Sequence, residues 1–103
     1  MKLYHVTPSH NLDGIFKKGL IPQKGAYASE MGESEKAIWL FQTLEDAEEM
    51  IPIWLEPFYG DDLVILEITL PDDYQLEYSG SDYEVYTTMK IRPEHIRISE
   101  ERN

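Results

Sequence analysis

The chain has 103 residues, of which 42% are hydrophobic and 12% aromatic, and this predicts one packed domain over residues 1–103. It contains no cysteine, which excludes disulfides, thiolate metal sites and cysteine nucleophiles. The net charge of −11 predicts a solvated acidic surface or a basic partner, and it disfavours nucleic acid because no basic patch is visible. No apolar run approaches the ~20 residues that cross a bilayer. No signal peptide precedes the first predicted strand, so we expect a soluble cytoplasmic protein with no membrane partner.

A short strand opens the predicted fold. Residues 2–6 alternate well enough for a strand with Leu3 and His5 on one face and Tyr4 on the other. Residues 7–9, with the sequence Thr-Pro-Ser, are expected to turn the chain.

A helix is predicted over Leu12–Lys18, because apolar residues recur there at helical spacing. Ser9 or Asn11 can cap its first turn, and Gly19 is the expected stop residue. Residues 23–36 are polar and lack a clear period, which indicates a loop.

The middle of the chain is predicted to hold a buried strand followed by a second helix. Residues 37–41, A-I-W-L-F, indicate the strand. Thr43 and Asp46 have the spacing of a capping box, so the helix is expected to start there. It should run to about Ile51, where Pro52 ends or kinks it.

The remaining predicted elements are mostly short strands. Residues 53–59 are apolar and aromatic but interrupted by a proline, and they receive no assignment. The predicted strands are residues 63–70, 75–78, 82–88 and 96–98, with a turn at 93–95. Five or six short strands and two helices predict an α+β fold that is mostly antiparallel.

Three stretches of the sequence, taken in order, resemble one known superfamily. They are L-Y-H-V-T with G-L-I-P (residues 3–7 and 19–22), A-I-W-L-F-Q-T-L-E-D-A (37–47) and D-Y-E-V-Y-T-T-M-K-I-R-P-E-H-I (82–96). Together they are similar to ADP-ribosyltransferases of the His-Tyr-Glu type, which include poly(ADP-ribose) polymerases, diphtheria-type toxins and small bacterial and phage transferases. The resemblance implies a small ADP-ribosyltransferase-like fold that uses NAD as substrate. It also implies mono-ADP-ribosyl transfer to a macromolecular acceptor, as by a toxin or phage effector. The acidic surface suggests a protein acceptor, and a basic one.

The first stretch implies a place for the adenosine ribose. In the family a histidine on the first strand, usually followed by Gly and then Ser or Thr, holds this ribose. The matching run here is His5, Val6 and Thr7. Val6 departs from the pattern, because the small residue normally found there allows close backbone contact with nicotinamide. Tyr4, next to His5, fits either the core or the wall of the pocket, and the same holds for Tyr83 and Tyr86 in the third stretch.

The other two stretches imply the nicotinamide and catalytic positions. Trp39 stands where the family usually has a Tyr that stacks on nicotinamide; a Trp can also stack but lacks the phenol hydroxyl. The family's catalytic glutamate begins a late strand, and counting back from I-R-P-E-H-I places it at Glu84. A different alignment places it at Asp82. With Glu84 as the catalytic residue, Asp82 resembles the first acid of an acid-x-Glu motif that helps to position the acceptor.

The chemistry of the implied reaction explains why these residue types are needed. Cleavage of the bond between nicotinamide and ribose builds positive charge on the ribose, as in glycoside cleavage. Glu84 could supply a carboxylate that favours this charge, Trp39 a flat apolar surface for the leaving ring, and His5 a donor that anchors the far ribose. No metal is needed, and His5, His10 and His95 lack the spacing of metal ligands.

The sequence leaves three alternatives open. Val6 and Trp39 are nonstandard for the family, which favours a binding module that holds ADP-ribose or a partner protein without turnover. Asp82 and Glu84 lie at i and i+2 of a strand, about 6.5–7 Å apart, which suits hydrolysis of NAD or of a glycoside. Transfer of a 2′-phosphate from RNA to NAD needs a basic cluster, and the basic residues are too scattered to form one.

Overall fold

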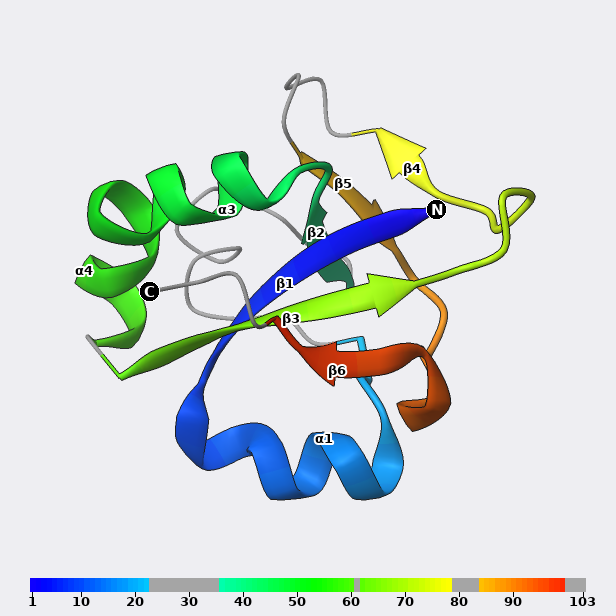
Figure 1. The fold of residues 1–103 in the computed structure, drawn as a ribbon, viewed down its shortest axis with the longest axis horizontal. Coiled ribbons are helices and arrows are strands. Elements are labelled where there is room, and N and C mark those ends of the chain that lie inside the picture. Colours follow the sequence, from blue (N-terminus) through cyan, green and yellow to red (C-terminus); the bar gives the residue numbers. More distant parts are fainter. Residues whose placement is uncertain (23–35, 61, 79–83, 100–103) are drawn as a thin grey trace.

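An antiparallel six-stranded sheet forms the centre of the protein, with its strands in the order β4-β5-β2-β1-β3-β6 (Figure 1). The computed structural model describes residues 1–22, 36–60, 62–78 and 84–99. The strands are β1 (Lys2–Pro8), β2 (Ile38–Phe41), β3 (Leu63–Thr69), β4 (Glu77–Tyr78), β5 (Glu84–Thr87) and β6 (Ile96–Ile98). The helical segments are η1 (Ser9–Asn11), α1 (Leu12–Lys18), α3 (Leu44–Met50), η2 (Ile51–Leu55), α4 (Glu56–Tyr59) and η3 (Pro93–His95). The predicted α+β, mostly antiparallel fold is confirmed.

Strands β1 and β3 form the longest pair in the described sheet. Their register runs from Lys2 opposite Thr69 to Pro8 opposite Leu63. The turn expected at residues 7–9 is therefore wrong, because pairing with β3 keeps the chain extended through Pro8. The 3-10 turn η1 begins directly afterwards.

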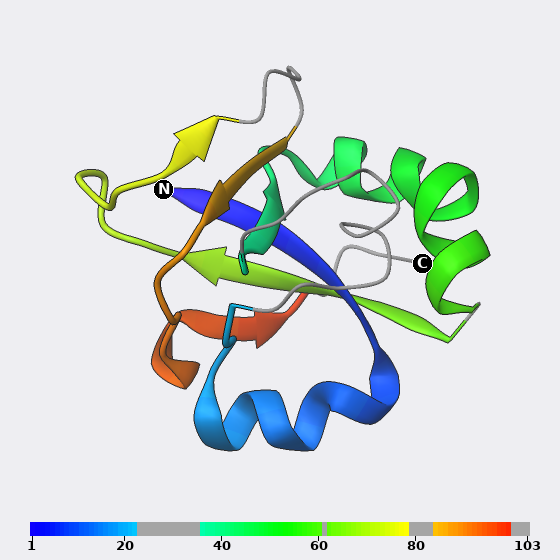
Figure 2. The ribbon, with the colours of Figure 1, turned by 180° about the vertical axis from the view of Figure 1, so that it is seen from behind.

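The two faces of the sheet pack against different helices. Leu66 and Ile68 of β3 belong to one hydrophobic cluster with Ile15 of α1. Ile65 of the same strand belongs to a second cluster with Ala47 of α3. Successive strand residues point to opposite faces, so α1 covers one face and α3 with η2 covers the other (Figures 1 and 2).

Helix α1 has the bounds that its apolar stripe predicts, and Gly19 ends it with φ +86°. The predicted side-chain cap is wrong. Asn11 occupies the N-cap position without a side-chain capping bond, and its Nδ2 donates to Thr7 Oγ1 at 3.2 Å. Ser9 Oγ donates instead to Asp62 of the loop before β3. Both polar side chains therefore tie the start of α1 to neighbouring segments.

Helix α3 begins as predicted, because Thr43 Oγ1 accepts a hydrogen bond from Asp46 N at 3.0 Å. It ends at Met50, one residue before the predicted end. Beyond it the chain stays helical through the π-helix η2 and the short α4, which the sequence pattern did not indicate. Pro52 has no N–H to donate to the preceding turn of α3, and the change from α-helical to π-helical geometry occurs at this point. No helix in the described ranges has the length and apolar character needed to cross a bilayer.

The late strands are close to their predicted places but mostly shorter. Strand β4 keeps only Glu77 and Tyr78 of the predicted edge strand, and β6 has the predicted bounds. Strand β5 begins at Glu84. The start of the predicted strand 82–88, which includes Asp82, lies outside the described residues.

Candidate functional site

Three neighbouring strands carry the residues that the sequence singles out. His5 lies in β1, Trp39 in β2, and Glu84 is the first residue of β5, with β2 between the other two strands (Figure 1). The sheet thus brings three distant parts of the chain side by side. Asp82, the alternative catalytic acid, lies outside the described residues.

Glu84 and Trp39 share the face of the sheet that α3 covers. In the register of β2 and β5, Glu84 is opposite Phe41 and Tyr86 is opposite Trp39. Directly opposed residues of an antiparallel pair place their side chains on the same face, and Phe41 belongs to the cluster beneath α3. We call these four residues the β2–β5 group. Its Phe41 end is buried, whereas Trp39 and Tyr86 are only partly buried.

The Trp39 ring contacts Tyr86 but makes no hydrogen bond to any described residue. The two ring centroids are 4.8 Å apart and the planes are tilted by 40°. The indole Nε1 is buried without a hydrogen-bond partner among the described residues. A buried donor left unpaired costs roughly 1–3 kcal/mol, so fold stability alone does not explain this ring. Unpaired buried groups of this kind call for another explanation, such as a role in function.

His5 reaches this region from the opposite face. It lies opposite Leu66, which belongs to the cluster under α1. The register of β1 and β2 pairs Tyr4 with Phe41, and a continued ladder would pair Val6 with Trp39. Instead, His5 Nδ1 lies 2.8 Å from the Trp39 carbonyl oxygen. The imidazole of His5 therefore links β1 to β2 where the described ladder ends.

The hydrogen bond to Trp39 assigns the tautomer of His5. A carbonyl oxygen only accepts, so Nδ1 carries the proton and Nε2 of the neutral ring is an acceptor. Burial lowers the pKa of His5 below its usual value, although the bond to the Trp39 carbonyl acts in the opposite direction. The side chain is partly exposed by area, but its ring is desolvated enough to remain neutral near pH 7.

The other residues that the resemblance implies are packed into the fold. Tyr4 and Val6 pack against the cluster beneath α3. Thr7 is buried, and its hydroxyl accepts from Asn11. These contacts account for the three side chains as structural residues, and their part in binding stays a prediction.

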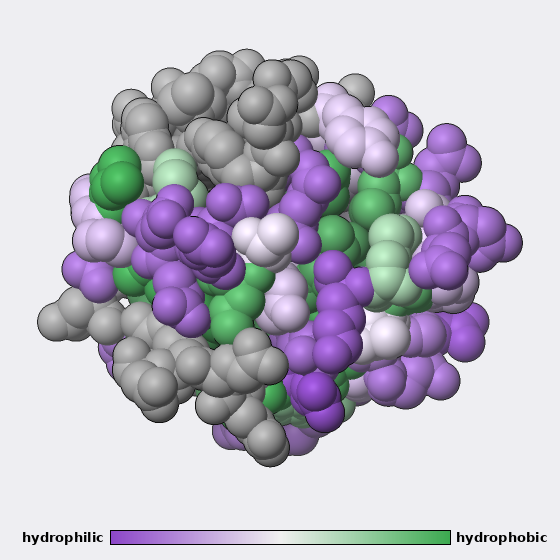
Figure 3. Space-filling model, turned by 45° about the horizontal axis from the view of Figure 1, so that its top comes forward, coloured by the Kyte–Doolittle hydropathy of each residue, from purple (hydrophilic) through white to green (hydrophobic). Residues whose placement is uncertain are grey.

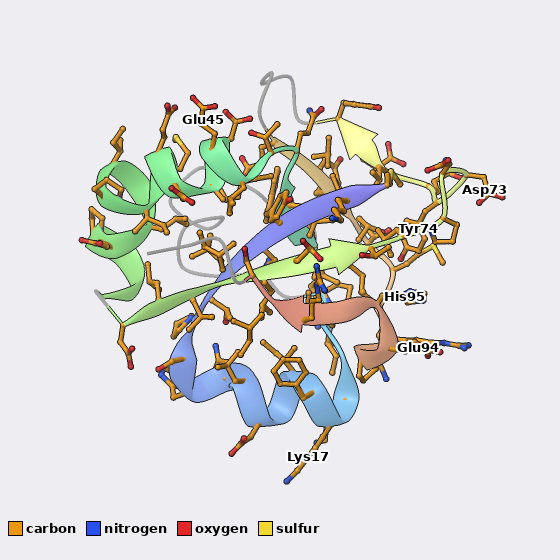
Figure 4. All side chains as sticks on the ribbon, in the orientation of Figure 1. Lys17, Glu45, Asp73, Tyr74, Glu94 and His95 are labelled. Carbon is orange, nitrogen blue, oxygen red and sulfur yellow. The ribbon has the colours of Figure 1, made fainter. Side chains whose placement is uncertain are left out.

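Charged side chains are arranged unevenly around the sheet. Glu67 of β3 is buried and forms ion pairs with Lys2 of β1 and Arg97 of β6. On the outer side of α3 the exposed residues include acids such as Glu45, whereas Lys17 points outward from α1 (Figure 4). With the top of the molecule turned forward, hydrophilic residues predominate around α3 and hydrophobic residues show between them (Figure 3).

Sequence reasoning left Tyr86 open as either core or pocket wall and missed Glu67 altogether. The signal for Tyr86 was its position two residues after Glu84, which places both on one strand face. No comparable signal marks Glu67, because its partners lie on two other strands.

Comparison with protein-family models and with curated proteins finds no match for this chain. Among the described residues, no group of three His, Asp or Glu side chains is arranged to hold a metal ion. The chemistry of the candidate site therefore has to be inferred from the β2–β5 group and His5 themselves.

Proposed function

We propose that this protein binds NAD and transfers its ADP-ribosyl group to a protein acceptor. Glu84 is the catalytic carboxylate in this proposal, and the Trp39 ring is the surface for nicotinamide. The observation that carries it is the shared face of the β2–β5 group, where Glu84 lies beside the Trp39–Tyr86 pair. The unpaired indole Nε1 supports it, since this ring lacks the partner that a purely structural Trp would have.

The reaction needs two features on this face of the sheet: a group that stabilises positive charge and a surface for the leaving ring. The bond between nicotinamide and the ribose carbon breaks with its electron pair leaving on nicotinamide, and a nucleophile of the acceptor bonds to that carbon and loses a proton. Positive charge builds on the ribose in between, and the Glu84 carboxylate favours it electrostatically. Trp39 offers an apolar ring for the flat leaving group.

His5 has a supporting part in this proposal. Its bond to the Trp39 carbonyl holds β2 beside β1 and so helps to position Trp39 from the opposite face of the sheet. This differs from the role expected from the sequence, in which His5 anchors the far ribose.

Transfer of label from NAD tests the proposal. The protein is incubated with NAD labelled in its adenosine half and with cell lysate, and both transferred label and released nicotinamide are measured. Loss of the carboxylate in Glu84→Gln should lower the rate by about 10²–10³-fold, a typical loss for one electrostatic stabiliser. The matched control is Glu94→Gln, an exposed acid in η3, which should keep the wild-type rate. Equal rates for Glu84→Gln and wild type, with both folded by circular dichroism, contradict the assignment.

A binding module without turnover is the second candidate, and the packing of Val6 favours it. Val6 lies against the cluster beneath α3, on the sheet face that Trp39 and Glu84 share, and so takes up room there. Calorimetry with NAD and with ADP-ribose tests this candidate. Binding of either without nicotinamide release supports the module. Steady nicotinamide release with no acceptor present supports hydrolysis of NAD.

A further inference from the structure

Tyr86 lies directly across from Trp39 in the register of β2 and β5. Its ring centroid is 4.8 Å from that of Trp39, within the range in which aromatic pairs attract each other. The 40° tilt is intermediate between stacked and edge-to-face. The position of either ring is therefore coupled to that of the other.

In the described part of the chain no hydrogen bond fixes the plane of the Trp39 indole. Its Nε1 has no hydrogen-bond partner. Its strand neighbours Ile38 and Leu40 point to the opposite face and join the cluster under α1. The torsion that turns an indole about its bond to Cβ has broad minima. The contact with the Tyr86 ring therefore restricts the rotation of the indole.

We infer that Tyr86 is a positioning residue that fixes the plane of the Trp39 indole and so sets how tightly a flat aromatic ligand is held. The identity of the ligand, nicotinamide, rests on the proposed function. The restriction of the Trp39 ring by Tyr86 does not. Tyr86 acts through Trp39 and has no direct role in the chemical step. Its replacement should therefore change substrate affinity more than turnover.

The variants separate the ring of Tyr86 from its hydroxyl. Tyr86→Phe keeps the ring pair and should behave like wild type. Tyr86→Leu removes the pair and should weaken binding of nicotinamide and NAD by roughly two- to tenfold, with KM raised and kcat nearly unchanged. Tyr86→His has a smaller and more polar ring that should pack less closely on the indole, so it also weakens the pair and serves if the Leu variant does not fold. The matched control is Tyr78→Leu, an exposed tyrosine of β4, which should leave affinity unchanged.

Ring motion gives a readout that does not depend on NAD. The chain has two tryptophans, so Trp39 is the one that remains when Trp54 is replaced by Phe. The time-resolved fluorescence anisotropy of this variant therefore reports the rotation of Trp39. Subnanosecond depolarisation should increase in Tyr86→Leu or Tyr86→His and stay at the wild-type level in Tyr86→Phe and Tyr78→Leu.

The two measurements keep the inference and the proposed function apart. Freer ring motion in the Leu or His variant, rescued in Tyr86→Phe, supports the positioning role. Unchanged ring motion in a folded Leu or His variant overturns it, whatever the protein binds. If wild type binds neither NAD nor nicotinamide, the proposed function fails while the anisotropy still decides the role of Tyr86.

Discussion

His5 is the residue whose protonation is tied most directly to the candidate site. Its Nδ1 proton is donated to the Trp39 carbonyl, and its ring is desolvated between β1 and β2. Protonation of Nε2 would place a positive charge in this desolvated position. The imidazole of His5 therefore stays neutral in the folded protein. Acid should lower the stability of the fold as well as the binding of a ligand.

The stability of the protein should fall with acid through His5. Because burial lowers the pKa of His5 in the folded state, the unfolded chain binds more protons below about pH 6.5. Folding stability is then lost as pH falls from 6.5 towards the folded pKa, at up to about 1.4 kcal/mol per pH unit. His5→Asn keeps a donor for the Trp39 carbonyl without titrating in this range.

Urea unfolding of wild type and His5→Asn between pH 7.5 and pH 5 measures this effect. The difference between the two curves cancels every other titrating group, and wild type should lose more stability with acid. Parallel curves for the two proteins would show that the pKa of His5 is not lowered by folding.

At the scale of the elements, three glycines in or directly after helices allow the cost of adding a Cβ to be compared. Gly19 and Gly60 have φ near +87°, each after a helix, whereas Gly14 lies inside α1. A Cβ at Gly14 or Gly60 would meet nothing within 4 Å, but one at Gly19 would overlap the carbonyl oxygen of Ile91. That carbonyl accepts from Leu20 N, so it cannot move without loss of a hydrogen bond.

Replacing each glycine by alanine should therefore give a graded series. Gly14→Ala should stabilise the protein by about 0.5–1 kcal/mol through helix propensity. Gly60→Ala should destabilise it by about 1–3 kcal/mol, because its φ is nearly closed to a residue with a Cβ. Gly19→Ala adds the overlap with Ile91 and should cost more than Gly60→Ala. The free energy of unfolding in urea measures all three, and equal effects at Gly19 and Gly60 would contradict this account.

Elements that depend on local signals could be predicted from the sequence, and those that depend on distant partners could not. The apolar stripe and Gly19 located α1, and the capping spacing of Thr43 located the start of α3. The helical path beyond Pro52 was missed because it depends on the π-helical turn rather than on a helical period.

The candidate site shows the same limit. Its residues could be named one by one, but the faces they occupy follow from the register of β1, β2 and β5. The sequence therefore did not predict that His5 approaches from the α1 side. It also did not predict that Tyr86 is the ring against Trp39.

At the scale of the whole molecule, the protein combines a large excess of acid with a buried carboxylate, that of Glu67, which forms ion pairs across three strands of the sheet. The chain has 20 acidic residues and nine Lys or Arg. Two of these bases, Lys2 and Arg97, bind Glu67 from the strands on either side of β3. Glu67 thus joins the centre of the sheet to its β6 edge, in a chain whose other acids largely repel one another.

Glu67→Gln should weaken this connection in a way that depends on pH and salt. The hydrogen bond from Arg97, followed by the charges of Arg97 and Lys2, lowers the pKa of Glu67 against the opposing effect of burial. Its contribution is therefore present above the unfolded pKa of about 4.5 and is lost as pH falls from there through the lowered pKa of the folded state. Since the Arg97 and Lys2 side chains are 68% and 58% exposed, solvent screens the pairs, and we expect a loss of roughly 1–2 kcal/mol at pH 7.

Urea unfolding at pH 7 and at pH 4, each in low and in 1 M salt, tests the role of Glu67. The deficit of Glu67→Gln should shrink at pH 4 and in high salt, because at pH 4 the carboxyl group of the unfolded chain begins to take up a proton and salt screens the pairs with Lys2 and Arg97. Asp72→Asn is the matched control, since Asp72 pairs with the N-terminal ammonium while 96% exposed and should contribute little. A deficit that is the same in all four conditions would mean that Glu67 acts through packing. The β6 edge would then be held by its ladder to β3 and by the apolar contacts of Ile96 rather than by charge.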